Sequence, residues 1–226
     1  MQIYEQAYGG KIFRPTPEVH LEDDGSLCII ATPWGGRSSA KKAIEVIVDT
    51  FLSSHTDLES TTPFEKDLSI SPTANHLRAA TLLANQQIYA EINTNEYHSG
   101  CELFVCAKID NELSIIQTGQ PQVFLAKKSL PIVPLATAAD LSTCLSPNGY
   151  QLPPLPNALM GLEKTIQLNL YTYPLSSDCK VILLSRSFVP PRFLSVDGSD
   201  VNIELLVDTL IKQDESMPFW LGVIQL

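Results

Sequence analysis

The chain has 226 residues, of which 44% are hydrophobic and 18% charged, and this composition predicts one compact domain over residues 1–226 rather than a disordered or repeat protein. Its formal net charge of −10 excludes a basic surface that would bind nucleic acid or an anionic membrane. The sequence starts without a secretory signal and has no apolar run near the roughly 20 residues that span a bilayer, so we expect a cytoplasmic protein.

The first half of the chain predicts a buried strand followed by two helices. Residues 26–31 are short and apolar, which is typical of a buried strand. Ser38 or Ser39 then caps a helix whose apolar residues recur at three and four positions as far as Leu52. The same spacing predicts a second helix over residues 73–93.

The second half predicts alternating strands and one further helix. Residues 102–109 and 112–117 flank Asp110-Asn111, a pair that tolerates positive φ and suits a hairpin turn. Further strands are expected at 122–126, 165–173, 180–184 and 219–225, with a helix at 200–213 capped by Asp200. Residues 129–156, which are rich in proline and serine, predict a long irregular connection. Runs of antiparallel strands with helices in separate runs predict an α+β sandwich.

Cysteines and histidines do not predict a metal or disulfide site. The five cysteines include no C-x-x-C pair, so we interpret them as small buried side chains. Cys101 and Cys106 are an odd number of positions apart in one predicted strand and therefore face opposite sides of its sheet. The four histidines are scattered, which is typical of surface or hydrogen-bonded histidines.

A glycine turn, Ile30-Ala31-Thr32-Pro33-Trp34-Gly35-Gly36, joins the first predicted strand to the first helix. It resembles the signature of the metal-dependent protein phosphatase 2C family, which reads roughly V-A-D-G-M-G-G. The resemblance implies that the aspartate and the glycine carbonyl would hold catalytic cations. Here Thr32-Pro33 replaces Asp-Gly, and a threonine hydroxyl beside a proline supplies little of the anionic oxygen that Mg²⁺ or Mn²⁺ prefers.

Five further motifs of the family resemble segments of this chain in the same order. The segments, each with the family pattern that it resembles, are residues 14–19 (R-x-x-N-E-D), 100–102 (G-T-T), 118–124 (v-G-D-S-R-a-y), 183–188 (l-L-x-S-D-G-L) and 218–224 (D-N-x-T-v-v-v). At aspartate positions of these patterns the chain has Val19, Gln120, Arg186 and Pro218. Each motif has therefore lost its most diagnostic residue, whereas the order and the hydrophobic pattern remain.

The resemblance implies a four-layer α-β-β-α sandwich, in which two antiparallel sheets are flanked by helices. It also implies a mechanism in which two Mn²⁺ or Mg²⁺ ions activate a water that attacks a phosphoserine or phosphothreonine. With Val19, Thr32, Arg186 and Pro218 at aspartate positions, the charge that would hold the ions is missing, and a cation at Arg186 would repel them. We therefore expect no bound metal, no catalytic residue and no hydrolysis by the family's route.

Arg14 matches the arginine that, as the resemblance implies, holds the substrate phosphate. With Arg186 in the same pocket, the former metal site could bind a phosphate without cleaving it. The alternative is that Arg14 and Arg186 pair with Glu18 or Glu22 and only replace the cations.

Three functional hypotheses follow. The first is a catalytically inactive phosphatase-like domain that binds a protein, phosphorylated or not, as a regulatory module in phospho-signalling. The second is a residual serine/threonine phosphatase with a rearranged metal site, which would need a new carboxylate cluster. The third is a structural or oligomerisation domain, which a large exposed apolar patch would favour. Trp34 and Trp220, both near lost metal positions, could fill the cleft or form an anchor for a partner.

Overall fold

The computed structural model describes residues 1–56, 63–138, 140–145, 154–175 and 179–226. The chain forms two compact units, each with one five-stranded antiparallel sheet. Unit 1 comprises Met1–Thr16, Gly119–Asn157 and Leu175–Leu226, and unit 2 comprises Pro17–Thr118 and Ala158–Pro174. A single domain over residues 1–226 stays a prediction.

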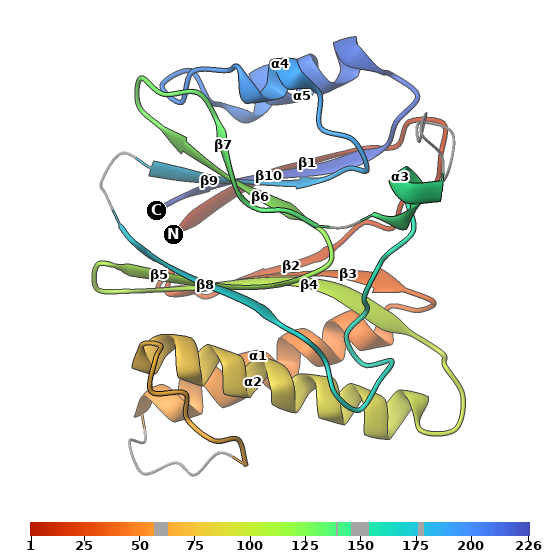
Figure 1. Cartoon of the computed structure of the whole chain (residues 1–226), viewed down its shortest axis with the longest axis vertical. Coiled ribbons are helices and arrows are strands. Elements are labelled where there is room, and N and C mark those ends of the chain that lie inside the picture. The colour runs from red at the N-terminus through yellow and green to blue at the C-terminus, as the bar shows by residue number, and fades with distance from the viewer. Residues whose placement is uncertain (57–62, 139, 146–153, 176–178) are drawn as a thin grey trace. The chain divides into compact units, whose positions relative to one another are not determined.

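Unit 2 contains the sheet β2-β3-β4-β5-β8 and the two long helices (Figure 1). Its elements are β2 (Glu18–Leu21), β3 (Leu27–Trp34), α1 (Ser38–Thr56), α2 (Pro72–Ile88), the π-helix η1 (Tyr89–Asn93), β4 (Gly100–Ile109), β5 (Glu112–Thr118) and β8 (Asn169–Pro174). The predicted hairpin between β4 and β5 is confirmed, and Asp110 in its turn has a φ of 51°.

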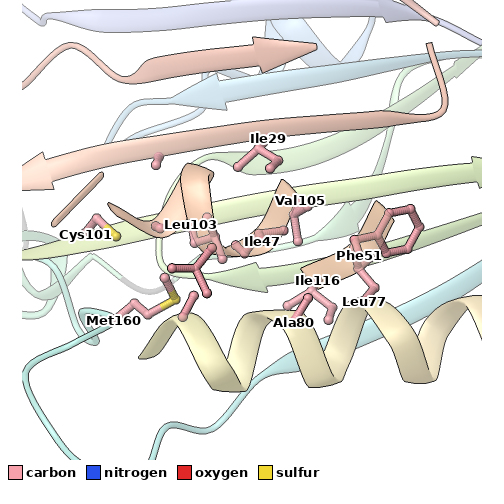
Figure 2. Close-up of a cluster of buried hydrophobic side chains, with 14 of the residues drawn as sticks. Ile29, Ile47, Phe51, Leu77, Ala80, Cys101, Leu103, Val105, Ile116 and Met160 are labelled. Atoms are coloured by element: carbon pink, nitrogen blue, oxygen red, sulfur yellow. The ribbon is translucent and has the colours of Figure 1, made fainter. Parts of the chain in front are cut away.

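The core of unit 2 lies between one face of its sheet and the helices α1 and α2. Apolar residues at helical spacing, such as Ile47 and Phe51 of α1 and Leu77 of α2, are no more than 1% exposed. They meet strand residues such as Leu103 and Ile116, which point to the same face of the sheet (Figure 2). Burial of these side chains is the main favourable contribution to the stability of unit 2.

Two buried asparagines fix the connection that leads to β8. Asn85 of α2 accepts a hydrogen bond from the Gly161 N–H at 2.7 Å. Asn93 of η1 donates through Nδ2 to the carbonyls of Ser99 at 2.7 Å and Gly161 at 2.8 Å. Its Oδ1 accepts from the N–H groups of His98 at 2.8 Å and Ser99 at 3.2 Å. Because one side chain satisfies four backbone groups, Asn93 holds two loops to the end of the helix.

Unit 1 contains the sheet β1-β10-β9-β6-β7. Its elements are β1 (Gln2–Tyr8), β6 (Gln122–Lys127), β7 (Val133–Ala136), α3 (Leu141–Leu145), β9 (Cys179–Ser185), α4 (Pro191–Leu194), α5 (Ile203–Gln213) and β10 (Phe219–Gln225). One face of the sheet packs against α4 and α5 in a second core, in which the rings of Phe124 and Phe193 meet edge to face with centroids 5.3 Å apart.

The predicted fold class is confirmed, because the chain is an α+β protein of two antiparallel sheets with flanking helices. Two strands, β1 and β7, are absent from the prediction. Each lies at a sheet edge, and the side chains of β1 are mostly exposed, so these strands lack a clear apolar alternation. The irregular connection predicted at 129–156 contains β7 and α3, and its residues 139 and 146–153 lie outside the described part.

Several local predictions need correction. Asp200 does not cap α5; Asn202 does, since its Oδ1 accepts from the Leu205 N–H at 2.8 Å. The strand predicted at 165–173 begins only at Asn169, since residues 166–168 have no regular secondary structure. Cys144 is exposed rather than buried, whereas Cys101 and Cys106 are buried as predicted.

Candidate functional site

Two of the degenerate metal positions lie on one face of the unit 2 sheet. In the strand register, Thr32 of β3 lies across from Glu102 of β4, and Val19 of β2 lies across from Ile30 of β3. Paired residues of antiparallel strands point to the same face, as do positions two apart, so Val19, Thr32 and Glu102 share a face. Thr32 and Pro33 are both buried. These unit 2 positions therefore offer a hydroxyl and apolar groups where the family pattern has a carboxylate.

Glu102 is a buried carboxylate that sequence reasoning did not assign to a site. It is 1% exposed, and the Trp34 indole Nε1 donates a hydrogen bond to its Oε2 at 3.0 Å. A detectable signal was present, since Glu102 is the one carboxylate in the otherwise apolar run from Gly100 to Ala107. Glu102 adds one carboxyl group to the face that holds Thr32.

The remaining degenerate positions lie in unit 1. Gln120 is 2% exposed, and its Oε1 accepts from the Gln122 N–H at 3.2 Å. Gln122 Nε2 donates to the backbone carbonyl of Arg186 at 3.1 Å. Pro218 is buried directly before β10, and Arg14 is 9% exposed. The family pattern has an aspartate at the position of Gln120 and an arginine at the position of Gln122. In this chain both positions carry neutral amides, and Gln122 connects the start of β6 to the end of β9.

The Arg186 guanidinium contacts the C-terminal end of α5. The residue is 1% exposed, and its Nη1 and Nη2 donate to the backbone carbonyls of Leu210 at 3.1 Å and Asp214 at 3.4 Å. Its Cζ lies 5.8 Å from the centroid of the Phe219 ring. A cation at this end of a helix complements the partial negative charge of the last carbonyls, of which that of Leu210 also accepts from the Asp214 N–H at 3.3 Å. Arg186 therefore stabilises α5, and phosphate binding by Arg14 or Arg186 stays a prediction.

The carboxylates considered as partners of these arginines have their own contacts in unit 2. Arg37 Nη1 donates to Glu18 Oε1 at 2.7 Å. His20 Nε2 lies 2.7 Å from Glu22 Oε1. Both pairs are partly exposed, so each contributes little to stability.

Each of the two tryptophans is hydrogen-bonded to a glutamate of a neighbouring strand. Trp34 donates to Glu102 within unit 2, and Trp220 donates through Nε1 to Glu5 Oε2 at 2.7 Å within unit 1. Trp220 is 2% exposed, and its ring lies so close to Gly222 that a Cβ there would come within 2.6 Å of the indole Cη2. Its indole covers the glycine of its own strand, which favours a space-filling role for Trp220 over an exposed anchor.

Asp140 ties the start of α3 to the residues that follow β9. Its Oδ1 accepts from the N–H groups of Ser142 at 2.9 Å and Leu155 at 3.0 Å, and Ser187 Oγ donates to its Oδ2. Burial raises the pKa of Asp140, but these hydrogen bonds outweigh burial, so that its pKa lies below the ordinary value of 3.8. The ionised carboxylate is the form that the fold stabilises.

This arrangement predicts that the contacts of Asp140 weaken in acid. A carboxyl with a lowered pKa in the folded chain adds stability above its unfolded pKa of about 4, and the stability is lost as the pH falls through the folded pKa. We expect the exchange protection of the Ser142 and Leu155 amides to drop as the pH falls below the unfolded pKa and through the lower folded pKa of Asp140, whereas the Gln122 amide, which binds a neutral side chain, keeps its protection. In Asp140→Asn the two amides should be less protected at neutral pH and show no acid step. If the loss of protection in acid persists in Asp140→Asn, a group other than Asp140 causes it.

The residues at the degenerate positions do not fit a pair of divalent cations. Hard cations prefer oxygen ligands that are mostly anionic, and these positions supply an alkyl group, a hydroxyl, an amide, two proline rings and a guanidinium. Within the described ranges, no group of three or more His, Cys, Asp or Glu side chains could hold a metal ion. Glu102 alone does not complete such a site.

The architecture is that of the PPM-type serine/threonine phosphatases. The PPM Ser-Thr phosphatase MsPP of Mycobacterium smegmatis, solved in complex with cacodylate, matches with a TM-score of 0.70 and 12% identity over 100% of this chain and 98% of that chain. PppA, a key regulatory component of T6SS in Pseudomonas aeruginosa, matches with a TM-score of 0.67 and 13% identity over 100% and 97%. The Mycobacterium tuberculosis serine/threonine phosphatase PstP/Ppp matches with a TM-score of 0.64 and 15% identity over 100% and 98%.

At these identities the similarity defines the fold. No protein-family model matches the sequence, and a search of curated proteins also gives no match. Among the described residues, no helix has the length and apolar character needed to cross a membrane.

Proposed function

We propose that this chain is a catalytically inactive protein phosphatase 2C-like domain that acts as a protein-binding or regulatory module in phospho-signalling in the cytoplasm. The observation that supports it most strongly is the placement of Arg186. Where the family pattern has an aspartate, the chain has a buried guanidinium that is bonded to the end of α5. This position therefore contributes to the stability of unit 1 and offers no ligand to a cation.

The partner in this proposal is a protein, and Arg14 is the residue that would recognise a phosphate on it. A guanidinium presents donors in a planar fork that matches two phosphate oxygens. Arg14 is 9% exposed and its guanidinium nitrogens are buried, so the groups that cover them must move before a phosphate can bind there. Arg37 is exposed and hydrogen-bonded to Glu18.

Phosphoester turnover and metal titration test the loss of catalysis. With excess Mn²⁺, the purified protein should release neither p-nitrophenol from p-nitrophenyl phosphate nor phosphate from phosphoserine and phosphothreonine peptides, and calorimetry should show no saturable Mn²⁺ heat. We expect this because the donors at the metal positions are mostly neutral or cationic. Turnover together with Mn²⁺ binding would overturn the proposal in favour of a rearranged site, and Glu102→Gln would then show whether Glu102 belongs to it.

Phosphopeptide titration tests the binding role separately. Binding of a phosphothreonine peptide should be saturable and should weaken at least about tenfold in Arg14→Ala, which corresponds to the loss of a charge-assisted fork. Arg37→Ala is the matched control and should bind like the unchanged protein. Equal loss in both variants would point to a general effect of positive charge rather than to a site at Arg14.

A further inference from the structure

Strand β8 forms one edge of the unit 2 sheet. It pairs with β5 over Asn169–Pro174, and no strand lies on its other side in the part of the chain that the structure describes (Figure 1). Such an edge presents a row of backbone N–H and C=O groups that can pair with another extended chain. Edge strands of natural proteins usually carry a feature that prevents this pairing.

The other three sheet edges carry such a feature, and β8 does not. β1 includes Glu5, β2 includes Glu18 and His20, and β7 includes Pro134. The sequence of β8, Asn-Leu-Tyr-Thr-Tyr-Pro, has no charged residue, and its proline is the last residue of the strand. Among the four edges, β8 is therefore the one whose side chains permit strand addition along nearly its whole length.

A pocket of about 390 Å³ lies beside this edge on the helix-facing side of the sheet. Its apolar wall is aliphatic and comes from the loop before α2, from α2, and from the segment that leads into β8: Ile70, Leu82, Ile166, Leu168 and Leu170. The last three alternate with polar residues and so point to one side. A strand added to β8 would turn every second side chain toward this pocket.

Arg78 of α2 gives the pocket a positively charged group. Its Nη1 donates to the Glu65 carbonyl at 3.2 Å, and a guanidinium has further N–H donors. Asp67, the other charged residue of the wall, is hydrogen-bonded to a nearby residue of its own loop. Its Oδ1 accepts from the Ser69 N–H at 2.9 Å and from the Ser69 Oγ at 2.6 Å. These bonds lower the pKa of Asp67, with a smaller contribution from Arg78. The remaining donors of Arg78 are suited to a carboxylate of a ligand.

The opposite face of the β8 edge is aromatic. Tyr171 and Tyr173 stack with ring centroids 6.4 Å apart, and they alternate with the residues that face the pocket. Aromatic side chains stabilise cross-strand neighbours on a sheet. An incoming strand would therefore meet an aliphatic pocket on one face and two tyrosines on the other.

We propose that β8 binds an extended segment of a partner protein, which adds a strand to the unit 2 sheet. One aliphatic side chain of this segment fills the pocket, and an acidic side chain two positions away binds Arg78. A second copy of this chain fits less well, because its β8 contains no acidic residue for Arg78 and because two copies would bring together net charges of −10 each. The inference rests on the proposed protein-binding role and names its surface.

The test uses the full chain and a fluorescein-labelled peptide, Thr-Val-Thr-Leu-Thr-Asp-Thr, whose binding is followed by fluorescence anisotropy. We expect saturable binding with a Kd on the order of 10–100 μM and a loss of at least about tenfold in Thr172→Lys, which places a charge on an exposed edge position. Arg78→Gln should weaken this peptide about fivefold but leave the peptide with Asn in place of Asp unchanged. Gln6→Lys on β1 is the matched control and should bind normally.

The outcomes separate this inference from the rest of the proposed function. The same peptide phosphorylated on the threonine that follows its leucine should bind β8 no more tightly, and Arg14→Ala should not affect the unphosphorylated peptide. Absence of saturation up to about 1 mM, or equal binding by Thr172→Lys, would overturn the β8 site and leave the Arg14 and Mn²⁺ experiments valid. A dimer in sedimentation that Thr172→Lys dissociates, without peptide binding, would assign the edge to a second copy and also overturn the proposal.

Discussion

Arg186→Asp, which restores the residue type of the phosphatase pattern, should destabilise the fold by at least about 3 kcal/mol and should create no Mn²⁺ site. The substitution removes both hydrogen bonds to the Leu210 and Asp214 carbonyls. It also places a negative charge at the negative end of α5 and leaves a space beside Phe219. Urea unfolding followed by circular dichroism measures the stability, and calorimetry measures Mn²⁺ binding.

Arg192→Asp is the control for this substitution, because it makes the same change of charge at an exposed position of α4. Its effect on the free energy of unfolding should stay below about 1 kcal/mol. If Arg186→Asp were as stable as Arg192→Asp and bound Mn²⁺, the guanidinium would be dispensable for α5 and the family's metal site would be latent in this chain. That result would remove the main support for an inactive domain.

Asn93→Asp is expected to cost about 3 kcal/mol near neutral pH although it hardly changes the shape of the side chain. Asn93 Nδ2 donates to the Ser99 and Gly161 carbonyls at 2.7 and 2.8 Å, and a carboxylate would instead place a negatively charged oxygen against both. The Oδ1 contacts to the His98 and Ser99 N–H groups can remain. The loss should appear as a lower urea midpoint and as faster exchange of the Gly161 amide, which Asn85 binds.

The pH dependence of this variant separates charge from packing. Burial against two carbonyls raises the folded pKa of the introduced carboxyl, so in the folded state it is already protonated at pH values above the unfolded pKa of about 4. The stability deficit relative to the unchanged chain should therefore shrink as the pH falls toward 4 and grow as the pH rises through the folded pKa. Asn111→Asp in the exposed hairpin turn should show neither effect. A deficit independent of pH would mean that packing, not the lost donors, dominates at Asn93.

The sequence predicted those elements whose pattern is local. Helix α1 begins at Ser38 as expected, and the turn at Asp110 has the positive φ that its residue type permits. The edge strand β1 escaped prediction because most of its side chains are exposed, so that no apolar alternation marks it. The cap of α5 was misplaced by two residues because Asp200 and Asn202 are both suitable cap residues.

The candidate site was only partly predictable, because its chemistry depends on contacts between residues distant in the sequence. The loss of a carboxylate at Thr32 is visible in the turn itself. Only the register of β3 and β4 shows that Glu102 lies across from Thr32. Only the position of the C-terminal end of α5 explains the direction of the Arg186 side chain. A motif shows which residue type occupies a position, whereas register and packing decide where its side chain points.

The two indole–glutamate pairs have an optical consequence. Trp34 belongs to unit 2 and Trp220 to unit 1, and the sequence has no other tryptophan. Each unit therefore contains its own intrinsic fluorophore, whose emission depends on the polarity around its ring. A variant that retains only one of them reports on one unit alone, so a pair of such variants distinguishes joint from stepwise unfolding of the two units without any added label.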